Sequence, residues 1–180
     1  YRMDVLHPID VIEDIAIAYN YNRIKPMWSQ ILTIGALSHD TVFRDLIREL
    51  MIGLGYQEIL TYIMTAPEVL SKKMNIELQR VVEIANPRLM TMTCLRNWLL
   101  PSLLEFLGQN TNVEYPQKIF EVGYCIIHNE EKENRTSDIE TLSCVTLHSN
   151  ASFTEVKSVL DTLFCNLGVS YSLTEACHGS

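Results

Sequence analysis

The sequence predicts an α+β domain in which a mixed, mainly antiparallel sheet is flanked by helices. Two observations lead to this fold class. The helical segments do not alternate regularly with the strands, and several short β-prone runs follow one another across short loops. Apolar residues make up 47% of the 180 residues and charged residues 20%, which is ordinary for a globular protein with a core. A doubly wound parallel sheet is therefore disfavoured.

Two long helices carry the clearest periodicity. The first is expected to start at Ser38 or Asp40, repeats apolar side chains at helical spacing from Val42 to Leu54, and is ended by Gly53 and Gly55. Residues 152–168 begin with Ser152-x-x-Glu155, the spacing of a capping box, and place apolar residues along one side. Shorter helices are expected over 10–19, opened by a capping box at Asp10 and Glu13, over 67–74 and over 99–110. Strands are expected over 58–65, 80–85, 118–127, 141–148 and 169–173, with a solvated loop over 128–138.

Composition excludes several classes of function. The net charge of −8, with no basic cluster, makes this chain a poor surface for binding phosphates. The five cysteines include no C-x-x-C pair, so a structural zinc site and a disulfide framework are disfavoured. There is no P-loop, no G-x-G-x-x-G and no G-x-S-x-G motif, and no apolar run approaches the roughly 18 residues of a membrane span.

Four carboxylates lie within eleven residues, on either side of the start of the first helix. They are Asp4, Asp10, Glu13 and Asp14. Converging hard oxygen ligands suit Mg²⁺, which binds a few carboxylates together with waters. Acidic side chains at a helix N-terminus also cap the backbone and interact favourably with the helix dipole. Spacing leaves both interpretations open.

Arg96 precedes the helix expected over 99–110. It could bind an anion near the start of that helix. The alternative is that Arg96 packs and forms a salt bridge that orients the helix, for instance with Glu121. The alternative is favoured on the sequence.

The order and spacing of several segments resemble the beta subunits of phenylalanyl-tRNA synthetases, most closely the archaeal and eukaryotic-cytosolic branch. The resemblance covers essentially the whole chain. It is carried by 1–22, 43–59, Asn86-Pro87, Leu95-Arg96, 99–104, Asn110, 119–123 and 153–171. Residues 1–22 resemble the end of the family's B-five domain. One departure is Asn20, where the family usually has Gly; Asn tolerates the same left-handed conformation.

The resemblance implies a domain organisation and a role. Residues 1–26 would be the C-terminal part of the B-five domain, 27–37 a connector, and 38–180 a truncated core of the class II synthetase type. The family's Mg²⁺ positions would fall on Asp4, Asp10, Glu13 and Asp14. The subunit would have lost catalysis and would scaffold the alpha subunit, which holds the ATP site. The assembly would be a cytoplasmic heterotetramer of two alpha and two beta subunits that charges tRNA-Phe, with no membrane association.

Two other functions compete with this interpretation. A free-standing class II-like enzyme would activate a carboxylate with ATP, but it needs an Arg two residues before Glu121, and Ile119 stands there. A nucleic-acid module is the weaker rival, because only the tail of a B-five domain is present and the charge is acidic. Finally, the apolar stripe of the helix at 40–54 is wide enough for part of it to face a partner or to lie wholly in the core. The family resemblance favours a partner.

Overall fold

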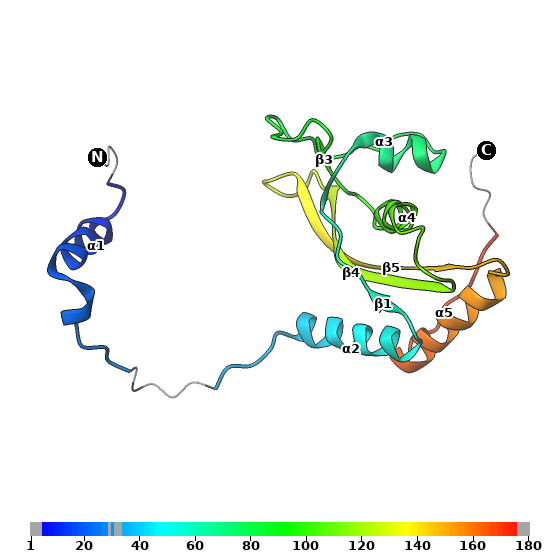
Figure 1. Cartoon of the computed structure of the whole chain (residues 1–180), viewed down its shortest axis with the longest axis horizontal. Coiled ribbons are helices and arrows are strands. Elements are labelled where there is room, and N and C mark those ends of the chain that lie inside the picture. Colours follow the sequence, from blue (N-terminus) through cyan, green and yellow to red (C-terminus); the bar gives the residue numbers. More distant parts are fainter. Residues whose placement is uncertain (1–4, 29, 31–33, 176–180) are drawn as a thin grey trace. The chain divides into compact units, whose positions relative to one another are not determined.

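The structure, a computed structural model, describes residues 5–28, 30 and 34–175. The chain divides into two compact units between Leu37 and Ser38. The first unit contains helix α1 (Pro8–Tyr19) and the 3₁₀ turn η1 (Tyr21–Arg23) (Figure 1). No helix in the described part of the chain is both long enough and apolar enough to cross a membrane.

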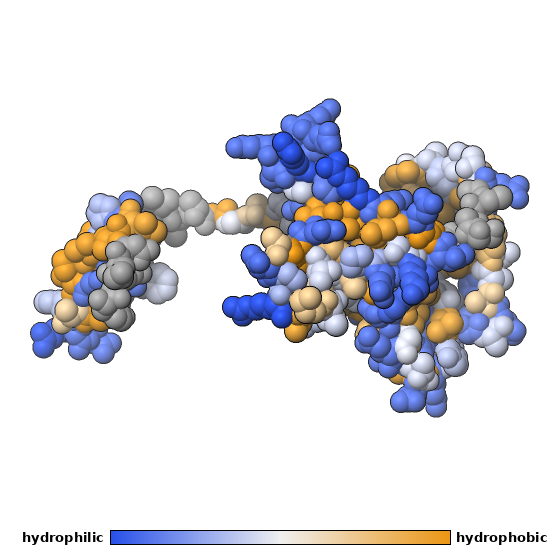
Figure 2. Space-filling view, turned by 90° about the horizontal axis from the view of Figure 1, so that it is seen from above, coloured by the Kyte–Doolittle hydropathy of each residue, from blue (hydrophilic) through white to orange (hydrophobic). Residues whose placement is uncertain are grey.

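Helix α1 begins at Pro8, whereas the sequence predicted a start at Asp10. Its capping box is formed by His7 and Asp10: the His7 side chain accepts a hydrogen bond from Ile9 N at 3.1 Å, and Asp10 Oδ2 accepts one from His7 N at 3.0 Å. The predicted start, with a box of Asp10 and Glu13, was wrong because Pro8 is well suited to the first helical position. Asn20 ends the helix at φ +81°, the positive φ expected of it. The helix has no buried residue, and Figure 2 shows apolar side chains on the surface of this unit.

The described part of the second unit, residues 38–175, has three helices of ten or more residues and two small sheets. Strand β4 is the centre of the larger sheet, with β1 parallel to it on one side and β5 antiparallel on the other, while β2 and β3 form an antiparallel pair. The elements are α2 (His39–Gly53), β1 (Gln57–Glu58), β2 (Met64–Thr65), α3 (Pro67–Leu70), η2 (Lys72–Met74), β3 (Cys94–Leu95), α4 (Leu100–Gln109), β4 (Gln117–His128), β5 (Thr136–Leu147) and α5 (Phe153–Leu167). The mixed, antiparallel-rich α/β architecture follows the sequence prediction.

Alternation along β4 divides the core into two layers. Phe120 and Val122 pack with Ile47 and Met51 of α2 and with α5 on one face of the sheet. Ile119 and Cys125 pack with α4 on the other face. Figure 1 shows the same arrangement, with α4 on one side of the sheet and α2 and α5 on the other. Period-2 alternation in a strand that is covered on both faces produces this division.

Three predicted strands differ in the structure. The strand over 58–65 is divided, because its start pairs with β4 and its end with β3. The segment 80–85 makes only an isolated bridge, from Glu83 to Cys94, because its partner segment is itself two residues long. The segment 169–173 is not a strand; Tyr171 stacks on Phe164 of α5 instead, with ring centroids 4.8 Å apart. By contrast, β4 and β5 form a longer hairpin than expected, which shortens the predicted loop.

Candidate functional site

A buried ion pair lies at the centre of the second unit. Arg96 Nη2 donates to Glu121 Oε1 at 2.8 Å, and both side chains are 2% exposed. Arg96 Nη1 donates to the Thr61 hydroxyl at 2.7 Å, and that hydroxyl donates to Glu121 Oε2 at 2.6 Å. Arg96 Nε donates to the carbonyl of Tyr124 at 3.0 Å. The guanidinium and both carboxylate oxygens therefore have partners from four separate points in the chain.

Gly123 makes this ion pair possible. A Cβ at position 123 would lie 2.6 Å from Arg96 Nη2 and 2.9 Å from Glu121 Oε1, closer than atoms can approach. A side chain at position 123 would therefore require Arg96 and Glu121 to shift from the positions in which they pair. Glu121-Val122-Gly123 and Leu95-Arg96, which are separate motifs in the sequence, thus meet in one buried ion pair.

The ion pair decides between the two interpretations of Arg96. The structure confirms that Arg96 packs and pairs with Glu121, and it leaves no open anion site at this side chain. Glu121 is 1% exposed and both of its oxygens accept hydrogen bonds inside the protein. A carboxylate held in this way is withdrawn from solvent, and it would have to leave its partners to bind a nucleotide.

The apolar stripe of α2 is divided between core and surface. Ile47 and Met51 are buried, at 7% and 0% exposure. Phe43 and Leu46, one turn earlier, are 56% and 42% exposed, and Val42 is also exposed. The division arises because the C-terminal half of α2 packs against α5, where Ile47 and Met51 share a core cluster with Leu163. The N-terminal half thus leaves an exposed apolar face, which we call the α2 face (Val42, Phe43 and Leu46).

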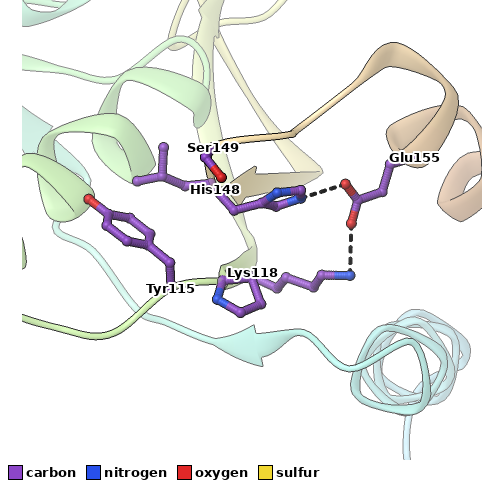
Figure 3. A pocket seen from close by; sticks show the side chains of 7 residues that line it. Tyr115, Lys118, His148, Ser149 and Glu155 are labelled. Atoms are coloured by element: carbon purple, nitrogen blue, oxygen red, sulfur yellow. Dashed lines mark hydrogen bonds and ion pairs between the residues drawn. The ribbon is translucent and has the colours of Figure 1, made fainter.

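A surface pocket of about 770 Å³ lies where β4 begins and β5 ends (Figure 3). One wall carries Tyr115 and the opposite end carries Glu155, the third residue of α5. Glu155 accepts an ion-paired contact from Lys118 Nζ at 3.0 Å and a hydrogen bond from His148 Nε2 at 2.7 Å. These three side chains form a clasp, the Glu155 clasp, which joins the start of β4, the chain just after β5 and the first turn of α5.

The Glu155 clasp is structural and lacks the geometry of a nucleophilic site. Ser149 lines the same pocket, so a serine, a histidine and a carboxylate lie near one another. His148 Nδ1, however, accepts from Asn150 N at 3.2 Å, and Nε2 therefore carries the proton that is donated to Glu155. Neither ring nitrogen is free to take a proton from Ser149, as the base of a catalytic triad must. The charges of Lys118 and Glu155 also compensate each other.

The Glu155 clasp predicts a pH dependence of stability. Hydrogen bonds from Lys118 and then His148 lower the pKa of Glu155 below its ordinary value of 4.5. A carboxyl group whose pKa is lowered by folding contributes stability above its unfolded pKa and loses that contribution as pH falls through the folded pKa. We expect the difference in unfolding free energy between the wild type and Glu155→Gln to be constant near neutral pH and to shrink below about pH 4.5. Urea unfolding as a function of pH measures this difference.

The matched control for this experiment is Glu131→Gln, a substitution in the β4–β5 loop. It removes one carboxylate of the same kind outside the clasp. If the stability difference between the wild type and Glu131→Gln shrinks in acid as it does for Glu155→Gln, then the Glu155 clasp is not the cause of the pH dependence.

The predicted metal ligands are only partly described. Asp4 lies outside the described residues. Asp10, Glu13 and Asp14 all lie on α1, where i, i+3 and i+4 spacing places them on one face, and Asp10 Oδ2 accepts hydrogen bonds from Leu6 N and His7 N at 3.0 Å each. Among the described residues, no three His, Cys, Asp or Glu side chains are arranged as a metal site. The donor set suits Mg²⁺ chemically, and its assignment stays a prediction.

Sequence reasoning missed the Glu155 clasp. It assigned Glu155 to a capping box with Ser152, and half of that box is present: the Ser152 hydroxyl accepts from Glu155 N at 3.4 Å. The Glu155 side chain reaches instead to Lys118 and His148, which the sequence pattern does not connect to it. The one feature of the sequence that could have indicated the Glu155 clasp was a charged residue in the first turn of a helix.

Comparisons with known proteins agree with the architecture. Residues 25–180 match the family model described as the phenylalanyl tRNA synthetase beta chain CLM domain. The whole chain aligns with phenylalanine–tRNA ligase beta subunits, at 46% identity with that of Pyrococcus abyssi, 44% with that of Pyrococcus furiosus and 35% with that of Thermofilum pendens. In each case it covers 32% of the relative, so the chain spans about a third of the length of the curated relatives it matches.

A solved structure shares the fold at low sequence identity. The pyrrolysyl tRNA synthetase PylSc of Desulfitobacterium hafniense superposes with a TM-score of 0.60 over 73% of this chain and 48% of that chain. The two sequences are 15% identical. The likeness therefore concerns the fold alone.

Proposed function

The chain belongs to the phenylalanyl-tRNA synthetase beta-chain family, and from that premise we propose that it is a non-catalytic part of phenylalanine–tRNA ligase that scaffolds the alpha subunit. The proposal rests on two features that occur together: a buried glutamate with no access for a nucleotide, and an exposed apolar helix face. Glu121 is sealed by Arg96, while the α2 face presents three apolar side chains to solvent.

The α2 face is the surface that we assign to the alpha subunit. An exposed apolar patch on a helix that is otherwise part of the core is typical of a protein interface. Phe43 is its largest side chain, and interfaces depend most on a few large anchors. The sequence favoured a partner at this helix, and the exposed residues of the α2 face are the ones that we expect the partner to contact.

Replacing Phe43 by Asp is expected to weaken binding to the matching alpha subunit by about 2 kcal/mol or more, because truncation or charging of an interface anchor has effects of this size. Folding should be retained, because Phe43 is 56% exposed. Co-purification with the alpha subunit, followed by titration calorimetry, measures the affinity, and circular dichroism measures the fold.

Ile52→Asp provides the matched control. Ile52 is 58% exposed and lies on the same helix, nine residues later and thus on the opposite side of α2. Binding that is weakened equally by both substitutions, or by neither, would place the alpha subunit elsewhere.

The fold type and assembly follow from the same premise. We infer that residues 38–180 are a class II synthetase core, that 1–26 end the B-five domain, and that 27–37 connect the two. The complete ligase would be a cytoplasmic heterotetramer of two alpha and two beta subunits that charges tRNA-Phe, with ATP bound by the alpha subunit. The absence of an Arg two residues before Glu121 supports the non-catalytic role over the rival, a free-standing ATP-dependent enzyme.

We further propose that Asp4, Asp10, Glu13 and Asp14 hold a structural Mg²⁺ ion. The ion would relieve repulsion between carboxylates at one end of α1. Asp14→Asn is expected to weaken Mg²⁺ binding by about tenfold, since one charged oxygen ligand is lost. Asp14 is preferred to Asp10 for this test because Asp10 also caps the helix.

Calorimetric titration of the intact beta subunit with Mg²⁺ measures the affinity, and circular dichroism checks that α1 persists. Glu131→Gln, a substitution in the second unit, is the control. Equal affinities in the wild type and Asp14→Asn would refute the assignment.

A further inference from the structure

A second pocket, of about 280 Å³, lies between helix α4 and the extended segment 60–65. One wall is a single face of α4, because Ser102, Glu105, Phe106 and Gln109 follow i, i+3, i+4 and i+7 spacing. The other face of α4 carries Leu103 and Leu107 into the core. The pocket is therefore built on a helix whose orientation is fixed by packing.

The opposite wall supplies aromatic, apolar and hydroxyl groups. Tyr62, Met64 and Thr65 come from the extended segment. Thr65 and Ser102, which both line the pocket and carry hydroxyl groups, are buried residues, at 7% and 8% exposure. Phe106 and Tyr62 provide aromatic rings, which attract cations at close range.

The charges of the residues that line the pocket favour a cationic ligand over an anionic one. Among the described residues that line the pocket, Glu105 is the only carboxylate, and none is a Lys, Arg or His. An anionic ligand would meet the Glu105 carboxylate with no cationic side chain in the lining to attract it, whereas a cation would find a charged acceptor, hydroxyl oxygens and ring faces. The volume suits a group the size of one side chain.

Glu105 already has a cationic partner that comes from outside the pocket. Lys73 Nζ of η2 lies 2.8 Å from Glu105 Oε1, but Lys73 does not line the pocket and its side chain is 58% exposed. An exposed ion pair of this kind is held weakly. A ligand ammonium that approaches from the pocket can replace the Lys73 ammonium at Glu105.

We propose that this pocket binds a primary ammonium group carried on a short apolar stem, the chemistry shared by a lysine side chain and a free alkylamine. The ammonium contacts Glu105 and the hydroxyl groups, and the stem lies along Phe106 and Met64. This role is separate from the scaffold function, because the α2 face shares no residue with the pocket.

The test is an NMR titration of the chain with n-butylammonium, with n-butanol as the neutral probe of equal length. Saturable shifts of the amides of α4 and of 60–65 are expected with the amine only. Glu105→Gln should weaken binding roughly tenfold, since a charge-assisted hydrogen bond is lost. Lys73→Ala should tighten it roughly two- to fivefold, since a competitor is removed. The two substitutions therefore act in opposite directions.

Glu130→Gln is the matched control. Glu130 forms a similar exposed ion pair, with 2.8 Å between its Oε1 and Arg80 Nη1, and neither residue lines the pocket. It should leave the affinity unchanged. A second titration with Nα-acetyl-lysine methylamide separates the two sources of the ammonium: equal affinity indicates that stem and charge suffice, and tighter binding indicates a lysine within a polypeptide. Equal shifts with butanol, no saturation with either amine, or no opposite effects of the two substitutions would overturn the proposal.

Discussion

Replacing Arg96 by Met is expected to lower the free energy of unfolding by about 3–5 kcal/mol, the effect of leaving a buried charge without its partner. Glu121 would keep only the Thr61 hydroxyl as a hydrogen-bond donor, in a site where its side chain is 2% exposed. Urea denaturation of the wild type and the variant measures the difference.

The double variant Arg96→Met with Glu121→Leu shows whether the loss of stability comes from the unpaired charge of Glu121 or from the lost packing of the Arg96 side chain. Removal of both charges is expected to restore most of the lost stability, because a buried ion pair can be replaced by apolar residues of similar size with little net change. If the double variant is as unstable as the single one, then the loss arises from the packing of Arg96 and not from an unpaired carboxylate.

Met51→Ala is expected to destabilise the second unit by about 2–5 kcal/mol, as truncation of a fully buried side chain does. Met51 is 0% exposed and packs in the cluster formed by α2, α5 and β4. Phe43→Ala, on the same helix, should change stability by no more than about 0.5 kcal/mol, because its side chain is largely in solvent. Thermal and urea unfolding of both variants measures this contrast.

The contrast between Met51 and Phe43 tests the division of the α2 stripe directly. Similar losses in the two variants would mean that Phe43 is also covered, and the α2 face would then not be available to a partner. For the same reason Met51 is unsuitable for binding experiments, because a charged residue at this position would unfold the core.

Local signals in the sequence predicted the helices well. Ser38 caps α2, Ser152 caps α5, and Gly168 ends α5 in the left-handed conformation, as the pattern of cap residues indicated. The start of α1 was misplaced because Asp10 can serve as an N-cap or as the third residue of a capping box. The choice depends on Pro8 and His7, whose effects the periodicity of apolar residues does not register.

Features that depend on distant residues were predicted less well. The pairing of Arg96 with Glu121 was foreseen as one option, but the requirement for Gly123 follows only from the approach of two side chains in space. The segment 80–85 has strand propensity, yet it found only a short partner. Residues 169–173 lie against α5 because a local aromatic contact at Phe164 competes with pairing in a sheet.

The junction of Thr61, Arg96 and Glu121 also has a consequence for the order of folding. The β4–β5 hairpin joins neighbouring segments across a short loop, so it can form early. Thr61 and Glu121 are 60 residues apart in the chain, and their contact closes a long loop, which is entropically unfavourable until the surrounding core is present. In pulsed hydrogen-exchange labelling during refolding, the amide of Ile59, bonded to the carbonyl of Phe120, should therefore become protected later than amides within the hairpin.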